Sequence, residues 1–271
     1  MKIAFICVNY NNFNYTRDYI NSALKFRNDC FLKIIIVDNA SEKDDINQLD
    51  KISFQEVEIL KSKKNVGYFK GLNIGIDSIN VGEYDYIIIG NNDLTFNTDF
   101  INELSNEKFD PSIFVIAPNI IKPDGTHQNP HIKNKFNYIK ILYRRIYFSN
   151  YYLSVIMQLF MNLKFRFTKS YDREGHNEEQ IICMGYGACY VLTRNFFNFS
   201  NRLDAPNFLM GEEAVLANQI LSQNGKIIYK PNIIVHHNDH TSIGKISNRK
   251  LYNFSKESYK YALKNHKFFK Y

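Results

Sequence analysis

Several common features are missing from this 271-residue sequence. Tryptophan is absent, and the four cysteines (Cys7, Cys30, Cys183 and Cys189) form neither a C-x-x-C pair nor a dense disulfide pattern. We therefore expect reduced, mostly buried thiols, as in a cytosolic protein. The patterns G-x-G-x-x-G, G-x-x-x-x-G-K-[ST], G-x-S-x-G and H-E-x-x-H are also missing. Their absence disfavours a Rossmann-type dinucleotide site and excludes a standard P-loop and the commonest hydrolase sites.

Neither a signal peptide nor a membrane-spanning run is recognisable. The N-terminus MKIAFICVNYNN has too short an apolar stretch and no small-residue cleavage site, so we expect it to be a first strand. Hydrophobic residues make up 45% and charged residues 23% of the chain, which is typical of a folded globular protein. Lysine and arginine number 34 against 27 acidic residues, and this net charge of +7 favours an anionic partner such as a nucleotide, a nucleic acid or a membrane surface.

The apolar runs indicate an α/β fold. Short β-branched runs without alternation are typical of strands that are buried on both faces of a parallel sheet. Such runs alternate with helix-like spacings, and this order predicts a mostly parallel, right-handed sheet flanked by helices. The expected strands are 3–8, 33–37, 57–60, 86–89, 113–118 and 187–192, and the expected helices are 15–27, 43–51, 69–79, 97–107, 212–223 and 248–265.

Residues 133–170 differ in kind from the rest of the chain. They are aromatic and basic, and they contain no aspartate or glutamate. The longest uncharged span is too short to cross a bilayer. We expect helices here, which either lie on an anionic membrane surface or pack on the domain itself.

Polar residues follow three of the expected strands. The first strand ends at Asn9-Tyr10-Asn11, the second at Asp38-Asn39-Ala40-Ser41, and the fourth at Asn91-Asn92-Asp93. Ligands of open α/β sheets bind outside the carboxyl ends of the strands, although any one of these sites could be an ordinary turn or helix cap. Between them, the glycine-containing segment 63–75 leads into an expected helix, whose N-terminus could bind an anion.

Six ordered motifs together resemble the family 2 glycosyltransferases of the GT-A fold, in particular their rhamnosyltransferase-like branch. They are VDNAS (37–41), N-x-G-x-x-x-G-x-N (65–73), NND (91–93), GACYVLTR (187–194), FLMGEEAVLANQI (208–220) and P-x-I-I-V-H-H (231–237). The resemblance covers about residues 2–242. We expect one glycosyltransferase domain over 1–245 and a helical tail over 246–271; the segment 133–170 lies outside the resemblance, as an insertion that is a candidate for acceptor or membrane contact.

The resemblance also implies a donor site for a UDP- or dTDP-sugar. Asp38 would bind the nucleobase, Asn9 would line the same pocket, Asn65 and Asn73 would lie near the nucleotide, and Lys70 would face the diphosphate. The metal-binding D-x-D of the family is reduced here to Asn91-Asn92-Asp93, so that Asn92 and Asp93 would meet the donor and Asp93 would bind Mg²⁺ or Mn²⁺. His236 aligns best with the histidine ligand of the family, and His237 is the alternative. His236 and His240 also permit a zinc site, although their spacing suits a helix better than a strand.

The family's acidic pair corresponds to Glu212 and Glu213. The resemblance implies that Glu213 is the general base of inverting transfer and that Glu212 orients a loop or the acceptor, whereas two acids in a first helical turn would also be explained by the helix dipole. The implied acceptor is a surface-polysaccharide or lipid-linked glycan at the inner face of the cytoplasmic membrane. We expect no nucleic-acid partner. The competing interpretations are a sugar-1-phosphate nucleotidyltransferase, for which the first strand end lacks the glycines, and a non-enzymatic basic protein that binds membrane or nucleic acid.

Overall fold

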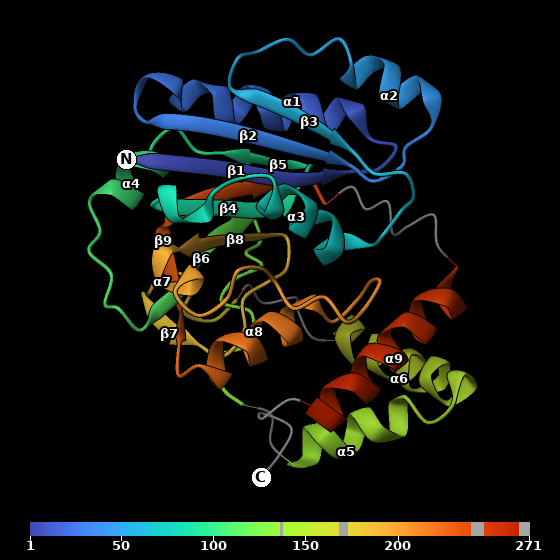
Figure 1. Ribbon diagram of the computed structural model, residues 1–271. Coiled ribbons are helices and arrows are strands. Elements are labelled where there is room, and N and C mark those ends of the chain that lie inside the picture. Colours follow the sequence, from blue (N-terminus) through green and yellow to red (C-terminus); the bar gives the residue numbers. More distant parts are fainter. Residues whose placement is uncertain (136–137, 168–172, 240–246, 266–271) are drawn as a thin grey trace.

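The computed structural model describes residues 1–135, 138–167, 173–239 and 247–265, and it has the expected α/β architecture (Figure 1). A nine-stranded sheet runs through the described residues in the order β3-β2-β1-β4-β8-β6-β9-β5, with β7 paired to β9. The strands are β1 (Lys2–Asn9), β2 (Phe31–Asp38), β3 (Val57–Lys61), β4 (Tyr86–Asn91), β5 (Leu94–Phe96), β6 (Ile113–Ile121), β7 (Gln180–Ile182), β8 (Cys189–Thr193) and β9 (Lys226–His237).

The first four long strands form the parallel part of the sheet. β1 pairs in parallel with both β2 and β4, and β2 pairs in parallel with β3. Their carboxyl ends therefore share one edge, where Asn9 lies beside Asp38 in the β1–β2 register. Beyond β4 the sheet becomes mixed, because β8 runs antiparallel to both β4 and β6. The sequence did not reveal the three-residue strands β5 and β7, whose hydrophobic patterns are too short to recognise.

Two apolar layers sandwich the sheet, which explains why the β1 sequence does not alternate. Ala4 and Ile6 face a core that includes residues of α3 (Tyr68–Asp77) and α8 (Glu212–Ser222). Ile3 and Phe5 face a second core that includes residues of α1 (Phe13–Leu24) and α4 (Phe100–Ser105). A strand with an apolar layer on each side needs apolar residues at every position. The remaining helices are the short α2 (Lys43–Leu49) and α7 (Arg194–Phe197) and the three described next.

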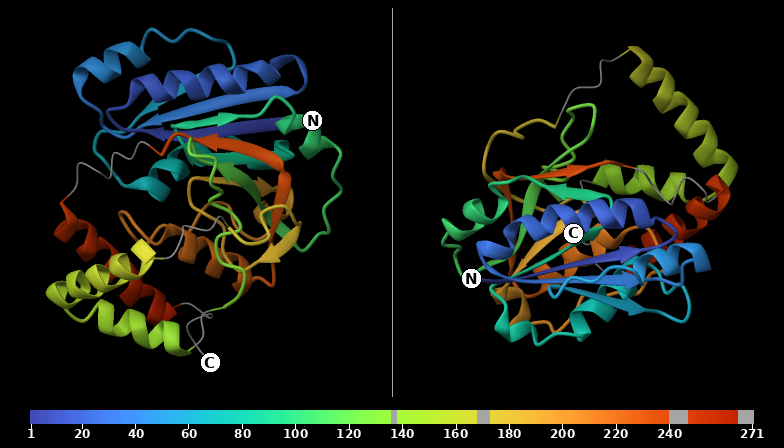
Figure 2. Two further views of the ribbon diagram at one scale, coloured as in Figure 1. Left: turned by 180° about the vertical axis from the view of Figure 1, so that it is seen from behind. Right: turned by 90° about the horizontal axis from the view of Figure 1, so that it is seen from above.

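Helices α5 (Tyr138–Tyr147), α6 (Tyr151–Phe167) and α9 (Asn248–Asn265) gather at one side, away from β3 and α2. The views of Figure 2 show α6 standing out from the body of the protein. The hydroxyl of Tyr259 on α9 donates to the carbonyl of Ile141 on α5 at 3.2 Å, so the C-terminal helix packs on the insertion. None of the described helices is both long and apolar enough to cross a membrane.

Candidate active site

A cleft of about 580 Å³ opens at the carboxyl edge of β1, β2 and β4. It lies where the parallel strands end and where the loop before α8 crosses the start of α3. Six of the residues to which the sequence argument gave a role as binding, metal or catalytic residues line it, including the alternative histidine His237. The lining residues are Val8, Tyr10, Asn11, Asn39, Glu42, Asn65, Gly67, Tyr68, Asn91, Asn92, Asp93, Tyr186, Gly187, Ala188, Phe208, Leu209, Met210, Gly211, Glu212, Glu213 and His237.

Asn9 and Asp38 lie beneath this cleft rather than in its wall. Both side chains are fully buried, and the Asn9 amide donates to the Asp38 carboxylate at 3.0 Å and to Ser41 Oγ at 3.1 Å. The Asn92 amide donates to Thr16 Oγ1 at 2.7 Å, and Thr16 in turn donates to Asn9 Oδ1 at 2.8 Å. This network ties the ends of β1, β2 and β4 together, so these residues shape the floor of the site.

Asn39 is the residue after β2 that reaches the cleft. Its amide nitrogen donates to Asn65 Oδ1 at 3.0 Å, and its oxygen accepts from the Val66 N–H at 2.9 Å. Asn39 is therefore joined to Asn65, and both line the cleft. The sequence argument quoted Asn39 within VDNAS but assigned the pocket to Asp38, because strand ends alone do not show which of two adjacent side chains turns outward.

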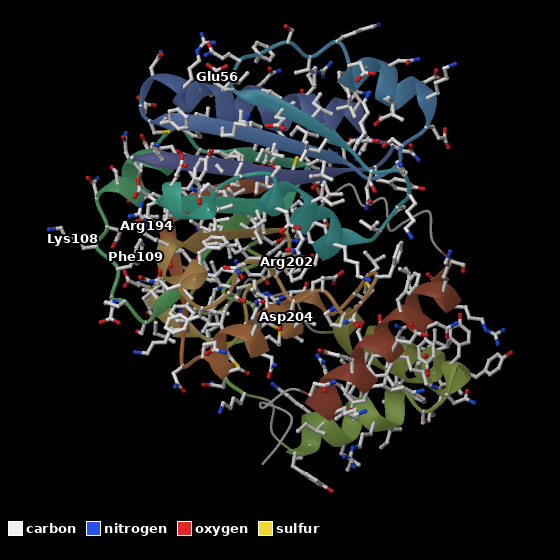
Figure 3. All side chains as sticks on the ribbon, viewed as in Figure 1. Glu56, Lys108, Phe109, Arg194, Arg202 and Asp204 are labelled. Atoms are coloured by element: carbon white, nitrogen blue, oxygen red, sulfur yellow. The ribbon has the colours of Figure 1, made fainter. Side chains whose placement is uncertain are left out.

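Asn73 and Lys70 on α3 lie outside the cleft wall. Asn73 exchanges two hydrogen bonds with the backbone of Leu203, one from its amide at 2.9 Å and one to its oxygen at 3.0 Å. Figure 3 labels Arg202 and Asp204 on either side of that residue, in the segment between α7 and α8. Asn73 therefore anchors this segment to α3, whereas the side chain of Lys70 is exposed to solvent.

An acid and an imidazole meet in the cleft after β4. His237 Nε2 lies 3.2 Å from Asp93 Oδ1, and both side chains are buried. On the other side of the ring, Nδ1 lies 2.7 Å from Gln128 Oε1. An amide oxygen only accepts, so in this arrangement Nδ1 carries a proton and donates to Gln128, while Nε2 faces the Asp93 carboxylate.

This pair fits a divalent cation. Two ligands at about 2.1 Å from an octahedral ion and at right angles to each other lie about 3 Å apart, close to the Asp93–His237 separation. A histidine ligand commonly donates its other N–H to an oxygen, as His237 does to Gln128. Across the described ranges, no group of three or more histidine, cysteine, aspartate or glutamate side chains could hold a metal. The remaining ligands would therefore have to come from a bound phosphate group and water.

His236, the histidine favoured from the sequence, does not fit this arrangement. Side chains of a strand alternate between the two faces, so neighbouring histidines on β9 point in opposite directions. His236 pairs with Thr95 of β5 and is exposed in a separate shallow depression beside Lys25. The alternative, His237, is the histidine that the structure places beside Asp93. His240 lies outside the described residues.

Two glutamates begin α8 on the other wall of the cleft. Gly211 precedes them with φ 84°, a left-handed conformation that glycine adopts at little cost, and Met210 has φ 72°. Burial, followed by the charge of Glu213, raises the pKa of Glu212 from 4.5 to about 8. The Oε1 atom of Glu212 is buried and has no hydrogen-bond partner among the described atoms. At neutral pH Glu212 is therefore mostly protonated.

Glu213 is held against the backbone at the start of the GACYVL motif. Burial raises its pKa, whereas the backbone N–H groups of Glu213 and Gly187 donate to the carboxylate and, with the charge of Arg144, oppose that rise. A side chain at position 187 would displace the Glu213 carboxylate, because a Cβ atom there would lie 2.8 Å from Glu213 Oε1. The Tyr68 hydroxyl donates to the Gly187 carbonyl at 3.1 Å. The sequence argument did not assign roles to Gly187 and Tyr68, which become recognisable only when α3 and β8 are placed side by side.

Comparisons with known proteins identify a matching family and structures of similar fold. Residues 4–172 match the family described as "Glycosyl transferase family 2". No match was found among curated protein sequences.

Three solved structures illustrate the structural likeness. GalNAc-T7 with UDP, GalNAc and Mn²⁺ has a TM-score of 0.58 and 14% identity, over 89% of this chain and 44% of that one. The mannosyltransferase PcManGT from Pyrobaculum calidifontis, in complex with GDP-Man and Mn²⁺, has a TM-score of 0.55 and 10% identity, over 87% and 56%. S. aureus TarS 1-349 in complex with UDP-GlcNAc has a TM-score of 0.58 and 10% identity, over 91% and 62%. These identities show the fold alone, and the chain spans about half the length of these proteins.

Proposed function

The chain belongs to glycosyl transferase family 2 and has the GT-A fold, and on that basis we propose that it transfers a sugar from a nucleoside-diphosphate sugar to a hydroxyl group of an acceptor. The observation that carries the proposal is that one cleft brings together the Asp93–His237 pair and Glu213. Such a transfer needs charge neutralisation on the leaving diphosphate and a base for the acceptor hydroxyl. One wall of the cleft offers the Asp93–His237 pair for the diphosphate, and the other wall offers Glu213 as the base.

The donor in this proposal is a UDP- or dTDP-sugar. Its nucleoside would lie over the ends of β1 and β2, where Asn39 and Asn65 offer amide groups in the cleft wall. Its diphosphate would lie near Asp93 and His237, which would hold Mg²⁺ or Mn²⁺. When bound, the cation supplies positive charge that stabilises the departing diphosphate. The complexes of GalNAc-T7 with UDP and Mn²⁺ and of PcManGT with GDP-Man and Mn²⁺ support a site of this kind.

Glu213 is the proposed general base of an inverting transfer. Burial raises the pKa of both carboxyl groups, but the charge of Arg144 opposes the rise at Glu213, whereas Glu212, with a pKa of about 8, keeps its proton at neutral pH. Glu213 accepts the proton of the acceptor hydroxyl as that oxygen forms a bond to the anomeric carbon. The bond from this carbon to the diphosphate breaks at the same time, and the nucleoside diphosphate leaves with the electron pair. Protonated Glu212 orients the acceptor or the preceding loop.

The proposed acceptor is a surface-polysaccharide or lipid-linked glycan, and a deoxyhexose such as rhamnose is a candidate for the transferred sugar because of the motif resemblance. Nucleotide sugars and free thiols fit the cytoplasmic face of the membrane, and all four cysteines are free. The insertion 133–170 would then hold the enzyme near a lipid-linked acceptor.

A donor panel with two variants tests this function. UDP- and dTDP-sugars that bind should raise the melting temperature in the presence of Mn²⁺. Glu213→Gln should retain that stabilisation but lose transfer by about 10² to 10⁴-fold, because general-base catalysis contributes about this much. Asp93→Asn should lose the stabilisation that depends on Mn²⁺. Glu257→Gln changes an exposed glutamate on α9 and serves as the control. Full transfer by Glu213→Gln would refute the assignment of the base.

A further inference from the structure

Exposed hydrophobic side chains are concentrated on α5 and α6. Of the 18 large hydrophobic residues that are exposed in the described part of the chain, 11 lie between positions 138 and 161. Their exposed fractions reach 74% at Ile139 and 70% at Phe160. The eleven are Tyr138, Ile139, Leu142, Tyr143, Ile146, Tyr152, Leu153, Ile156, Leu159, Phe160 and Met161, and we call them the α5–α6 face. Exposed apolar side chains in this number on two neighbouring helices mark a candidate interaction site.

The opposite sides of the same helices already have partners. On α5, Ile141 is 5% exposed, and Tyr147 packs against Tyr252 of α9. Phe148, just after α5, stacks on Tyr259 of α9 with ring centroids 4.8 Å apart. The helices therefore bury one side against α9 and leave the α5–α6 face outward, where Figures 1 and 2 show them standing away from the sheet.

The charge of this region selects its partner. Residues 133–170 contain eight lysines and arginines and no acidic residue. Lys140 and Arg145 are exposed on α5 itself, and Arg145 also hydrogen-bonds Tyr259 of α9. Helices that expose tyrosines, aliphatic side chains and basic residues are suited to the headgroup region of a bilayer with anionic lipids. A protein partner would instead need a large apolar surface that is surrounded by acidic groups, to complement the basic residues of this region.

We propose that the α5–α6 face docks on an anionic lipid bilayer, with the helices lying in the interface rather than crossing it. The apolar side chains enter the boundary between headgroups and acyl chains, and the basic side chains remain at the lipid phosphates. The absence of any membrane-spanning helix in the described residues agrees with this position.

Contacts of α9 link this face to the catalytic cleft. Tyr259 donates to the Ile141 carbonyl of α5 at 3.2 Å, and Ser258, its neighbour on α9, donates to the Met210 carbonyl at 2.5 Å. Met210 lines the cleft two residues before Glu212. A lipid-linked acceptor would lie at the bilayer. Docking therefore fixes how the cleft wall that carries the proposed base, Glu213, is oriented relative to that bilayer. This last step rests on the proposed function, whereas the docking itself does not.

Vesicle flotation of the full chain tests the docking. The protein is floated with vesicles of phosphatidylcholine alone and of phosphatidylcholine mixed with phosphatidylglycerol. We expect binding to the mixed vesicles, and weaker binding in high salt because the electrostatic part is screened. Lys140→Glu should reduce partitioning about tenfold or more. The double variant Ile139→Ser/Phe160→Ser should reduce it similarly. The matched controls Phe54→Ser and Lys51→Glu change exposed residues elsewhere and should bind like the wild type.

Two outcomes would overturn the proposal. One is failure of the wild-type protein to float with anionic vesicles. The other is a concentration-dependent dimer that the Ile139→Ser/Phe160→Ser variant abolishes, since the face would then join two copies. Sugar transfer to a water-soluble acceptor, measured without vesicles, distinguishes failure of the docking proposal from failure of the proposed function. Docking can fail while this activity persists, and the activity can fail while the protein still floats.

Discussion

The acidic pair at the start of α8 makes the stability of the protein depend on pH. The pKa of Glu212 rises from 4.5 to about 8 on folding, chiefly because its carboxyl group is buried, with 8% of the residue exposed. The folded chain thus holds this proton more tightly than the unfolded chain. The stabilisation is fully present below pH 4.5 and is lost as the pH rises through about 8. Glu212→Gln removes the titration and keeps the shape of the side chain.

The size of the effect follows from these two pKa values. One pKa unit corresponds to about 1.4 kcal/mol, and integration between pH 5 and pH 9 gives a loss of about 4 kcal/mol in the free energy of unfolding of the wild type. At about 2 to 4 °C per kcal/mol for a chain of this size, the melting temperature should fall by roughly 10 °C over the same range. In Glu212→Gln, the free energy of unfolding and the melting temperature should not show this decrease between pH 5 and pH 9.

Urea unfolding at pH 5 and pH 9 measures the effect directly, with the difference between the two free energies of unfolding compared across variants. Glu257→Gln on α9 is exposed and should behave like the wild type. The reasoning is refuted if Glu212→Gln loses as much stability between pH 5 and pH 9 as the wild type does.

Two further predictions concern the cleft. His237→Gln should abolish the thermal stabilisation that Mn²⁺ gives in the presence of UDP. His236→Gln, on the other face of β9, should leave this stabilisation unchanged. Equal effects of the two variants on the Mn²⁺ titration would contradict the assignment of His237 as the metal ligand. Gly187→Ala should keep the chain folded, because the added Cβ meets the end of the flexible Glu213 side chain rather than the backbone. It should still lower the turnover of sugar transfer about tenfold or more, because it displaces the Glu213 carboxylate. A turnover equal to that of the wild type would show that Glu213 tolerates the shift.

Six of the nine strands in the described residues, and most of the helices, were predictable because their signals are local. The non-alternating run of β1 predicted a strand buried on both faces, which the two cores on either side of Ile3 and Ala4 confirm. The helices at 212–223 and 248–265 were expected within one residue of α8 and α9. The antiparallel insertion of β8 between β4 and β6 was not predictable, because it depends on strand pairing across about a hundred residues.

The site was predictable in its residue types but not in the directions of its side chains. Polar strand ends indicated the edge of the sheet at which the cleft opens, yet directly after β2 the cleft is lined by Asn39 and not by Asp38. Likewise His237, and not His236, faces Asp93. In both cases the two candidates are neighbours in the sequence. A shift of one position on a strand, or in the turn that follows it, reverses the face.

The sequence by itself determined the layered α/β fold, the sheet edge at which the cleft opens, and the basic, aromatic composition of 133–170, since each of these depends on local pattern and residue type. Only the tertiary structure decided that Glu213 rests on Gly187, that Asn73 anchors Leu203, and that the exposed side of α5 and α6 faces away from α9. These contacts join residues far apart along the chain. They depend on how whole elements pack, which no local pattern specifies.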